Sequence, residues 1–166
     1  MITGDEPAFP TNVVDLLELK MLEIDPDDTQ VVKRPVDPMD QDQTIGITPV
    51  DWSPDRRSME MGKQANPKEE TIQRYTIMIQ GLINDSENEL AIKRHAIFST
   101  LIRRMVYRDR VLQLALPQLS VEIGGVREAM HSWGINSQRW MVNRREGSFI
   151  YMSALEFWFE TTNTPI

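Results

Sequence analysis

Two side chains in this sequence, His95 and His131, could serve as imidazole ligands or exchange protons near neutral pH. His95 falls in a segment with helical periodicity, near its apolar stripe, and His131 falls in a β-rich segment. Neither has a Glu-x-x-His or His-x-x-x-His partner, the spacing that places two metal ligands on one helix face. We therefore expect both to be structural histidines with satisfied ring nitrogens.

The acidic run Asp25-Pro26-Asp27-Asp28 resembles the start of a calcium-binding loop, because closely spaced carboxylates offer the oxygen ligands that Ca²⁺ prefers. A complete loop needs Gly at its sixth position and Glu at its twelfth, where this chain has Gln30 and Val36. We interpret the run as a helix end with solvated carboxylates, and we interpret three further acids in the same way: Asp37, Asp40 and Asp42.

Motifs of the common enzyme classes are absent from the sequence. It has no Gly-x-Ser-x-Gly motif, phosphate-binding loop or dinucleotide-binding fingerprint. With no cysteine, it has neither a thiolate metal site nor a cysteine nucleophile. The sequence therefore predicts a protein that is not an enzyme, with no cofactor and no metal.

An arginine cluster closes the longest predicted helix, with Arg103, Arg104 and Arg108 followed by Arg110. It has three interpretations: a solvated helix face, a contact with DNA, or a surface that meets the acidic N-terminal half of a neighbouring copy. Head-to-tail assembly brings complementary surfaces together, so we favour the third as a hypothesis.

Three tryptophans, Trp133, Trp140 and Trp158, fall in the C-terminal strands. Aromatic residues at such positions are ordinarily core, but tryptophan and arginine are also enriched among the residues that dominate protein interfaces. We therefore regard these tryptophans, with the arginine cluster, as candidate residues of a subunit interface.

Charge is unevenly distributed along the 166 residues, whose net charge is −7. Residues 1–70 carry −9 and residues 71–166 carry +2. This balance argues against wrapping nucleic acid, because such binding depends on Lys and Arg neutralising phosphates. The N-terminus lacks the pattern of a signal peptide, and no apolar run approaches the ~20 residues of a bilayer span. We expect no membrane association, and assembly in the cytoplasm.

The N-terminal half combines one helix with short strands. Helical spacing predicts a helix at 12–24, capped by Thr11 or Asn12. Gln30–Val36 and Thr44–Trp52 are predicted to be strands that their prolines confine to edges. The region 25–70 is rich in Pro and Asp, and we expect its last part, Ser53–Glu70, to be mobile.

The C-terminal half contains the longer elements. We predict a central strand at Thr71–Ile83 and a helix at Glu87–Arg108 that begins with a Ser86/Glu89 capping box. Its apolar stripe runs through Leu90, Ile97, Leu101 and Met105, joined by Ala91, Phe98 and Ile102. Val111–Leu119 is left open as short helix or loop. Three strands are predicted to follow: Val126–Trp133, Gln138–Arg145 and Ser148–Glu160, separated by turns at Gly134-Ile135-Asn136 and Glu146-Gly147.

The last of these strands, Ser148–Glu160, has apolar residues on both faces. Phe149, Tyr151, Leu155, Phe157 and Phe159 alternate with Ile150, Met152, Ala154 and Trp158. A strand with one solvated face would not show this pattern. Either helices cover both faces or a second copy of the protein supplies part of the cover.

These elements predict a single α+β domain over 1–166, an antiparallel sheet with a long C-terminal hairpin packed against one long helix and an N-terminal helix. The order of elements, the segments Thr44–Trp52 and Glu70–Gln80, and the closing hairpin resemble the tail terminator proteins of long-tailed, siphovirus-type bacteriophages. The resemblance extends from the first helix to Thr161.

The resemblance implies a structural virion protein of the tail and neck, assembled in the host cytoplasm. Members of that family form a homo-oligomeric ring, usually a homohexamer, on the last ring of the major tail tube protein. The ring ends tube growth and offers a docking surface to the head-tail connector or stopper protein, and DNA passes through its lumen without specific binding. A loop such as Ser53–Glu70 would become ordered in the ring.

Two other functions remain open at this point. The chain could be a head-closure protein or another neck or tail-completion component. It could also be a cytoplasmic adaptor that binds one partner without forming a ring.

Overall fold

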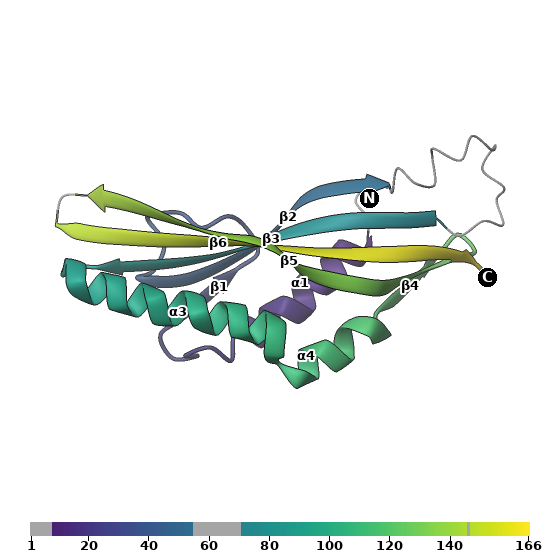
Figure 1. Cartoon of the computed structure of the whole chain (residues 1–166), viewed down its shortest axis with the longest axis horizontal. Helices are drawn as coiled ribbons and strands as arrows, with labels where there is room; N and C mark the ends of the chain where they lie inside the picture. The colour runs from purple at the N-terminus through teal and green to yellow at the C-terminus, as the bar shows by residue number, and fades with distance from the viewer. Residues whose placement is uncertain (1–7, 55–70, 146) are drawn as a thin grey trace.

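A six-stranded sheet in the order β1-β2-β3-β6-β5-β4 forms the body of the protein (Figure 1). The computed structural model describes residues 8–54, 71–145 and 147–166. Neighbouring strands are antiparallel except β1 and β2, which are parallel. The predicted α+β class is confirmed, with a mostly antiparallel sheet. Most of the segment predicted to be mobile, 55–70, lies outside the described residues.

In chain order the elements are α1 (Ala8–Met21), β1 (Gln30–Val32), β2 (Gln43–Pro54), β3 (Thr71–Asp85), α3 (Asn88–Arg108), α4 (Arg110–Ala115), the 3₁₀ helix η1 (Leu116–Gln118), β4 (Ser120–Ile123), β5 (Val126–Arg145) and β6 (Ser148–Pro165).

The helices lie on one face of the sheet, and the core fills the space between these two layers (Figure 1). Leu17 of α1, Phe98 of α3 and Phe157 of β6 belong to this core and are almost completely buried. Each such side chain contributes about 1.5–3 kcal/mol to folding by leaving water. β3 lies between β2 and β6, which confirms the predicted central strand.

The sheet-facing side of α3 contains part of the predicted stripe, Ala91, Phe98 and Ile102, while another part is exposed. Leu90, Ile97 and Leu101 are 44%, 63% and 40% exposed. The buried side is formed by Ala91, His95, Phe98, Ser99, Ile102 and Val106. The helix approaches Gly81 of β3 closely, and an added Cβ there would lie 2.8 Å from Cδ1 of Ile102. Ala91, Phe98 and Ile102 therefore pack on the sheet, while Leu90, Ile97 and Leu101 remain in solvent.

The predicted Ser86/Glu89 capping box is wrong. Glu87 is the N-cap residue of α3, and its side chain makes no capping hydrogen bond. The turn is held instead by Asp85, whose Oδ1 accepts from the Glu87 N–H at 3.0 Å and whose Oδ2 accepts from Arg94 at 2.8 Å. The backbone hydrogen bond from Glu87, followed by the bond from Arg94, lowers the pKa of Asp85.

The N-terminal elements are displaced from their predicted bounds. The first helix covers Ala8–Met21 rather than 12–24, so Thr11 and Asn12 lie inside it and Pro10 occupies its first turn, where a missing N–H costs nothing. β1 has three residues rather than the seven of Gln30–Val36. After β1 the chain turns over the other face of the sheet, where the Val36 N–H donates to Oε1 of Gln80 at 3.1 Å.

The segment Val111–Leu119, left open by the sequence, consists of α4 and η1. It leads into a strand that sequence reasoning missed, β4, which pairs with the start of β5. Gly124 and Gly125 connect the two with φ of 60° and 78°, the left-handed conformation that a tight hairpin requires. Gly147, at φ 77°, serves the predicted β5–β6 hairpin.

β5 is one strand, where two strands and a turn were predicted. Val126–Arg145 pairs with β6 along its length, with irregular register between Met130 and Ser132 and between Ile135 and Gln138. Because β6 is continuous, the chain absorbs the extra residues as bulges instead of leaving the sheet. Gly134 is needed at this point for packing, since an added Cβ would lie 2.9 Å from the ring of Trp158.

The two faces of β6 are covered unequally. Toward the helices, Tyr151, Leu155, Phe157 and Phe159 are buried. On the other face, the residues from Met152 to Glu160 are half-buried, and Glu156 and Glu160 are among them. The predicted shortage of cover on β6 is therefore smaller than its apolar composition suggested. The exposed apolar residues of the hairpin lie in β5.

Candidate interaction surface

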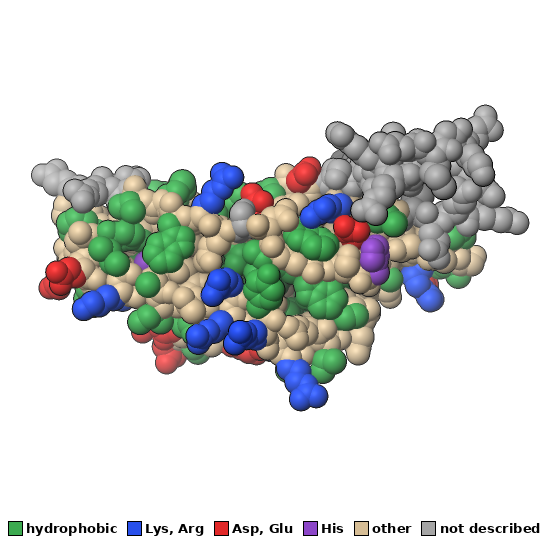
Figure 2. Space-filling view, viewed as in Figure 1, with side chains coloured by type: hydrophobic (Ala, Val, Ile, Leu, Met, Phe, Trp, Pro, Cys, Tyr) green, Lys and Arg blue, Asp and Glu red, His purple; other side chains and the backbone are tan. Residues whose placement is uncertain are grey.

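The arginine cluster lies at the junction of α3 and α4. Arg103, Arg104 and Arg108 are exposed in the last two turns of α3, and Arg110 is exposed at the start of α4. Figure 2 shows Lys and Arg side chains gathered over this helix. Arg103, Arg104 and Arg108 line a surface depression of about 390 Å³ together with Tyr107, which is 53% exposed. The predicted end of the helix and its exposed cations are thus found where the sequence placed them.

None of the four arginines forms an ion pair with another residue in the part of the chain that the structure describes. Six other cations do so: Lys20, Lys33, Arg34, Arg74, Arg94 and Arg127. The acid nearest in sequence, Asp109, is already engaged, because it caps the Leu112 N–H at 2.8 Å and lies 3.3 Å from Nζ of Lys20. The capping hydrogen bond is the main cause of the lowered pKa of Asp109.

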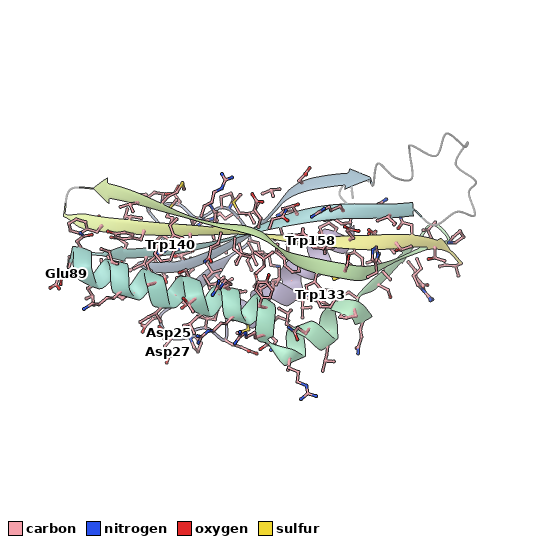
Figure 3. The ribbon with its side chains drawn as sticks, in the orientation of Figure 1. Asp25, Asp27, Glu89, Trp133, Trp140 and Trp158 are labelled. Carbon is pink, nitrogen blue, oxygen red and sulfur yellow. The ribbon has the colours of Figure 1, made fainter. Side chains whose placement is uncertain are left out.

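A groove separates the arginine cluster from the acidic loop that follows α1. Arg104 and Arg108 line one side, Glu23 and Asp25 line the other, and Leu101 contributes apolar surface. The groove has a volume of about 490 Å³. Figure 3 shows Asp25 and Asp27 on this loop, on the side of α3 away from the sheet. Basic and acidic side chains therefore line the same groove, but among the described residues Arg104 and Arg108 form no ion pair with Glu23 or Asp25.

The three candidate tryptophans have different surroundings (Figure 3). Trp133 is half-buried and packs against the core. Trp158 is half-buried on the opposite face, with its ring against Gly134 and the guanidinium of Arg74 4.5 Å from the ring centroid. Trp140 is 53% exposed. The structure thus brings Trp133 and Trp158 into contacts within the subunit and leaves Trp140 as the accessible one.

The outer edge of β5 is the feature that sequence reasoning missed. β4 pairs only with Val126–Ala129, so the backbone of residues 130–145 has a strand partner on one side alone. We call this stretch the β5 edge. Trp140, Met141 and Val142 are 53%, 53% and 56% exposed on it, and Figure 2 shows hydrophobic side chains over this strand. Reading 126–145 as two short strands hid the edge, although three consecutive apolar residues beside Arg139 could have signalled it.

His95 lies beneath Trp140. Its ring is completely buried between α3 and the sheet, with the ring of Trp140 at 4.7 Å and an interplanar angle of 89°, and that of Tyr151 at 5.9 Å. Neither ring nitrogen has a hydrogen-bond partner among the described residues, so the expectation of a satisfied histidine is wrong here. Burial lowers the pKa of His95 to about 4, because charging the ring would require solvation that the site does not offer.

His131 is exposed at the start of the β5 edge. Its Nδ1 lies 2.9 Å from Oγ1 of Thr162, and its Nε2 lies 3.5 Å from Oε2 of Glu160. These contacts fit the structural role expected from the sequence. Across residues 8–54, 71–145 and 147–166, no three His, Cys, Asp or Glu side chains are grouped to hold a metal ion.

Comparison with known proteins adds no family to this description: no protein-family model matches the chain, and no curated protein matches it. None of the described helices is long and apolar enough to cross a membrane. The arginine cluster and the β5 edge are therefore the two features on which a function can be built.

Proposed function

We propose that this chain is a structural assembly protein, and specifically a tail terminator that forms a ring between a phage tail tube and the head connector. The observation that carries the proposal is the β5 edge. A protein that works alone normally protects such an edge with a covering strand, proline or lysine, because unpaired N–H and C=O groups beside apolar side chains recruit another chain. The two bulges of the β5 edge end at Gln138, and beyond them Trp140, Met141 and Val142 stand half-exposed beside Arg139.

The arginine cluster supports an assembly that is held together head to tail. Arg103, Arg104, Arg108 and Arg110 lack acidic partners in the described part of the subunit, while residues 1–70 carry a charge of −9. A neighbouring copy that presents its acidic half would supply the missing partners. A head-to-tail contact of this kind joins two different surfaces of the same molecule, and repeated contacts form either a closed ring or an open filament.

The step from an assembly protein to a tail terminator rests on the element order and the segments Thr44–Trp52 and Glu70–Gln80. In this role the ring acts sterically: it caps the exposed subunits of the major tail tube protein, stops their polymerisation and presents a surface to the connector or stopper protein. The net charge of −7 suits a lumen through which DNA passes without binding.

Particles assembled without this protein test the proposal. A missing terminator leaves overlong or irregular tails in electron micrographs. Tails of normal length beside heads that lose DNA would assign a head-closure role instead. A virion that carries no copy of the protein, and assembles normally without it, would overturn the proposal and favour the adaptor.

The charge contact has its own test. Arg103→Glu together with Arg104→Glu should lower the yield of rings in size-exclusion chromatography with light scattering, and should reduce the sensitivity of assembly to salt. Lys93→Glu is the matched control, because Lys93 is exposed on the same helix, upstream of the cluster. Unchanged ring yield and salt response in the double variant would remove the arginine cluster from the interface.

A further inference from the structure

The sheet has a second open edge, on the side opposite β5. β1 pairs with β2 only at Thr44–Gly46, so the backbone of residues 47–54 has a strand partner on one side alone. We call this stretch the β2 edge. Val50 is 48% exposed on it and Asp51 is exposed. Pro49 removes one N–H donor from this edge and the register shifts between Pro49 and Asp51, so a strand that joins the edge must pair around these two irregularities. With that restriction, one molecule carries two edges that could accept a strand.

The directions of the strands make the two edges compatible. β2, β3, β6 and β5 alternate in direction, because each is antiparallel to the next. β5 therefore runs opposite to β2. If a second copy continues the sheet in the same orientation, its β2 lies beside the first copy's β5 and antiparallel to it, as in every other neighbouring pair of these strands.

Charge also matches across this junction. Asp51 pairs in register with Thr76, which pairs with Trp158, and Arg139 pairs with Ala154. Trp158 and Ala154 lie on the same, helix-free face of β6, because strand side chains alternate. Asp51 and Arg139 therefore share that face at opposite edges of the sheet. Neither forms an ion pair with another described residue.

We infer that the β5 edge of one copy pairs with the β2 edge of the next, with Asp51 opposite Arg139. The inference rests on the proposed assembly of copies and names the surfaces through which they join. Strand pairing satisfies unpaired backbone groups of both edges, and the added strand removes part of the β5 edge from water. Because the two edges differ, the contact is heterologous and can close into a ring.

Two β5 edges could not pair equally well. Residues 138–142 contain Arg139 and no acid, so an antiparallel β5–β5 contact centred there would bring Arg139 of both copies toward each other. The β2 edge contains Asp51 and no base within 47–54. Like charges on adjacent strands destabilise a sheet, whereas opposite charges stabilise it.

Cysteine trapping tests the pairing, and the chain contains no cysteine of its own. Asp51→Cys and Arg139→Cys are made in separate proteins, mixed and oxidised. Residues directly opposite in adjacent strands approach the Cβ separation that a disulfide needs. We expect disulfide-linked dimers that contain one chain of each variant. Ile97→Cys, at an exposed site on α3, is the control and should yield no linked dimer with either.

Each outcome of the trapping experiment supports or excludes the proposed pairing. Linked dimers of Arg139→Cys alone would replace this pairing with a β5–β5 contact, and absence of linkage in the mixture would exclude the β2–β5 junction. Charge reversal gives a second readout: Arg139→Glu and Asp51→Arg should each lose self-association, and mixing them should restore it. If the cysteine variants link but particles lacking the protein have normal tails, the strand pairing stands and the tail-terminator function is wrong. If the tails are overlong but no disulfide-linked dimer forms, the tail-terminator function stands and the strand pairing is wrong.

Discussion

The two halves of β5 both contain large apolar residues, but these residues have different surroundings. In the first half, Met130 is buried, and Trp133 and Ile135 pack against the core. In the second half, Trp140, Met141 and Val142 are more than half exposed. Both halves pair with β6. They differ in what lies beyond: β4, η1 and the core cover the first half, and α3 runs beside the second without covering it.

This comparison shows that apolar residues in a strand do not reveal where their cover comes from. The helix layer is wide enough for β3 and β6, and it ends before the distal half of β5. An apolar strand that extends past its own helices is a surface for another chain. Four predictions test whether the first half stabilises the fold and the second half serves assembly.

The largest effect is expected for Phe157→Ala, which removes the core side chain paired in register with Ile135. Phe157 is completely buried, so the variant loses transfer free energy and leaves a cavity. The free energy of unfolding should fall by about 3–5 kcal/mol. Urea denaturation followed by tryptophan fluorescence measures it. A loss below that of an exposed control, Ile97→Ala, would refute the role assigned to this half.

The next largest effect depends on pH and concerns the second half, through His95 beneath Trp140. The unfolded chain binds a proton at the ordinary pKa of 6.5, whereas the folded chain binds it only near pH 4. The contribution of His95 to the free energy of unfolding should therefore decline as pH falls from 6.5 to 4, by about 3 kcal/mol at most, and stay constant below pH 4. Protonation of Asp85 and Asp109, whose pKa values are lowered, causes a separate loss of stability at lower pH.

His95→Leu isolates this contribution. The variant should lose that part of the decline and, near neutral pH, should match or exceed the parent in stability, because it removes two unpartnered buried nitrogens. His131→Gln is the control and should retain the decline. Denaturant titrations across pH 4–7 give the comparison. An identical pH dependence in His95→Leu and the parent would show that His95 is not the group responsible.

A smaller effect is expected for Gly134→Ala, near the junction of the two halves. The added methyl would approach the Trp158 ring to 2.9 Å, so the indole must shift away from Arg74. We expect a loss of about 1–3 kcal/mol, measured by thermal or urea unfolding. Trp158→Leu should make the same glycine change nearly neutral. If the two substitutions add independently, the close contact does not determine the glycine.

The smallest effect on folding is expected for Val142→Thr on the β5 edge. Val142 is 56% exposed, so the free energy of unfolding should change by no more than about 0.5 kcal/mol. Self-association should nevertheless weaken. The same substitution at Val106, which is buried, should cost about 1–3 kcal/mol because it places a hydroxyl in the core. A large folding defect in Val142→Thr would mean that the edge already stabilises the subunit.

Elements with a strong local signal were predictable from the sequence. α3 was placed within one residue, β3 was recognised as central, and the hairpin at Gly147 was found. The exposed arginine cluster followed from the same helix. In each case the periodicity or the turn residue acts locally, so the sequence contains the deciding information.

Features that depend on tertiary contacts were not predictable. The broad apolar stripe of α3 was predicted, but which of its residues are buried was not: Phe98 and Ile102 pack on the sheet near Gly81, whereas Ile97 is exposed. The continuity of β5 through its bulges depends on the unbroken β6 beside it. His95 lacks a partner because of what α3 and β6 place around it, and the β5 edge exists because β4 is short.

The pairing of β3 with β6 has a mechanical consequence. The ladder runs without a register break from Thr71 opposite Asn163 to Asp85 opposite Phe149. Its hydrogen bonds lie across the strands, so tension applied along them strains the whole ladder together, not one bond after another. A ladder loaded in this direction resists force far better than one whose hydrogen bonds break in sequence from one end. This property suits a protein that carries mechanical load.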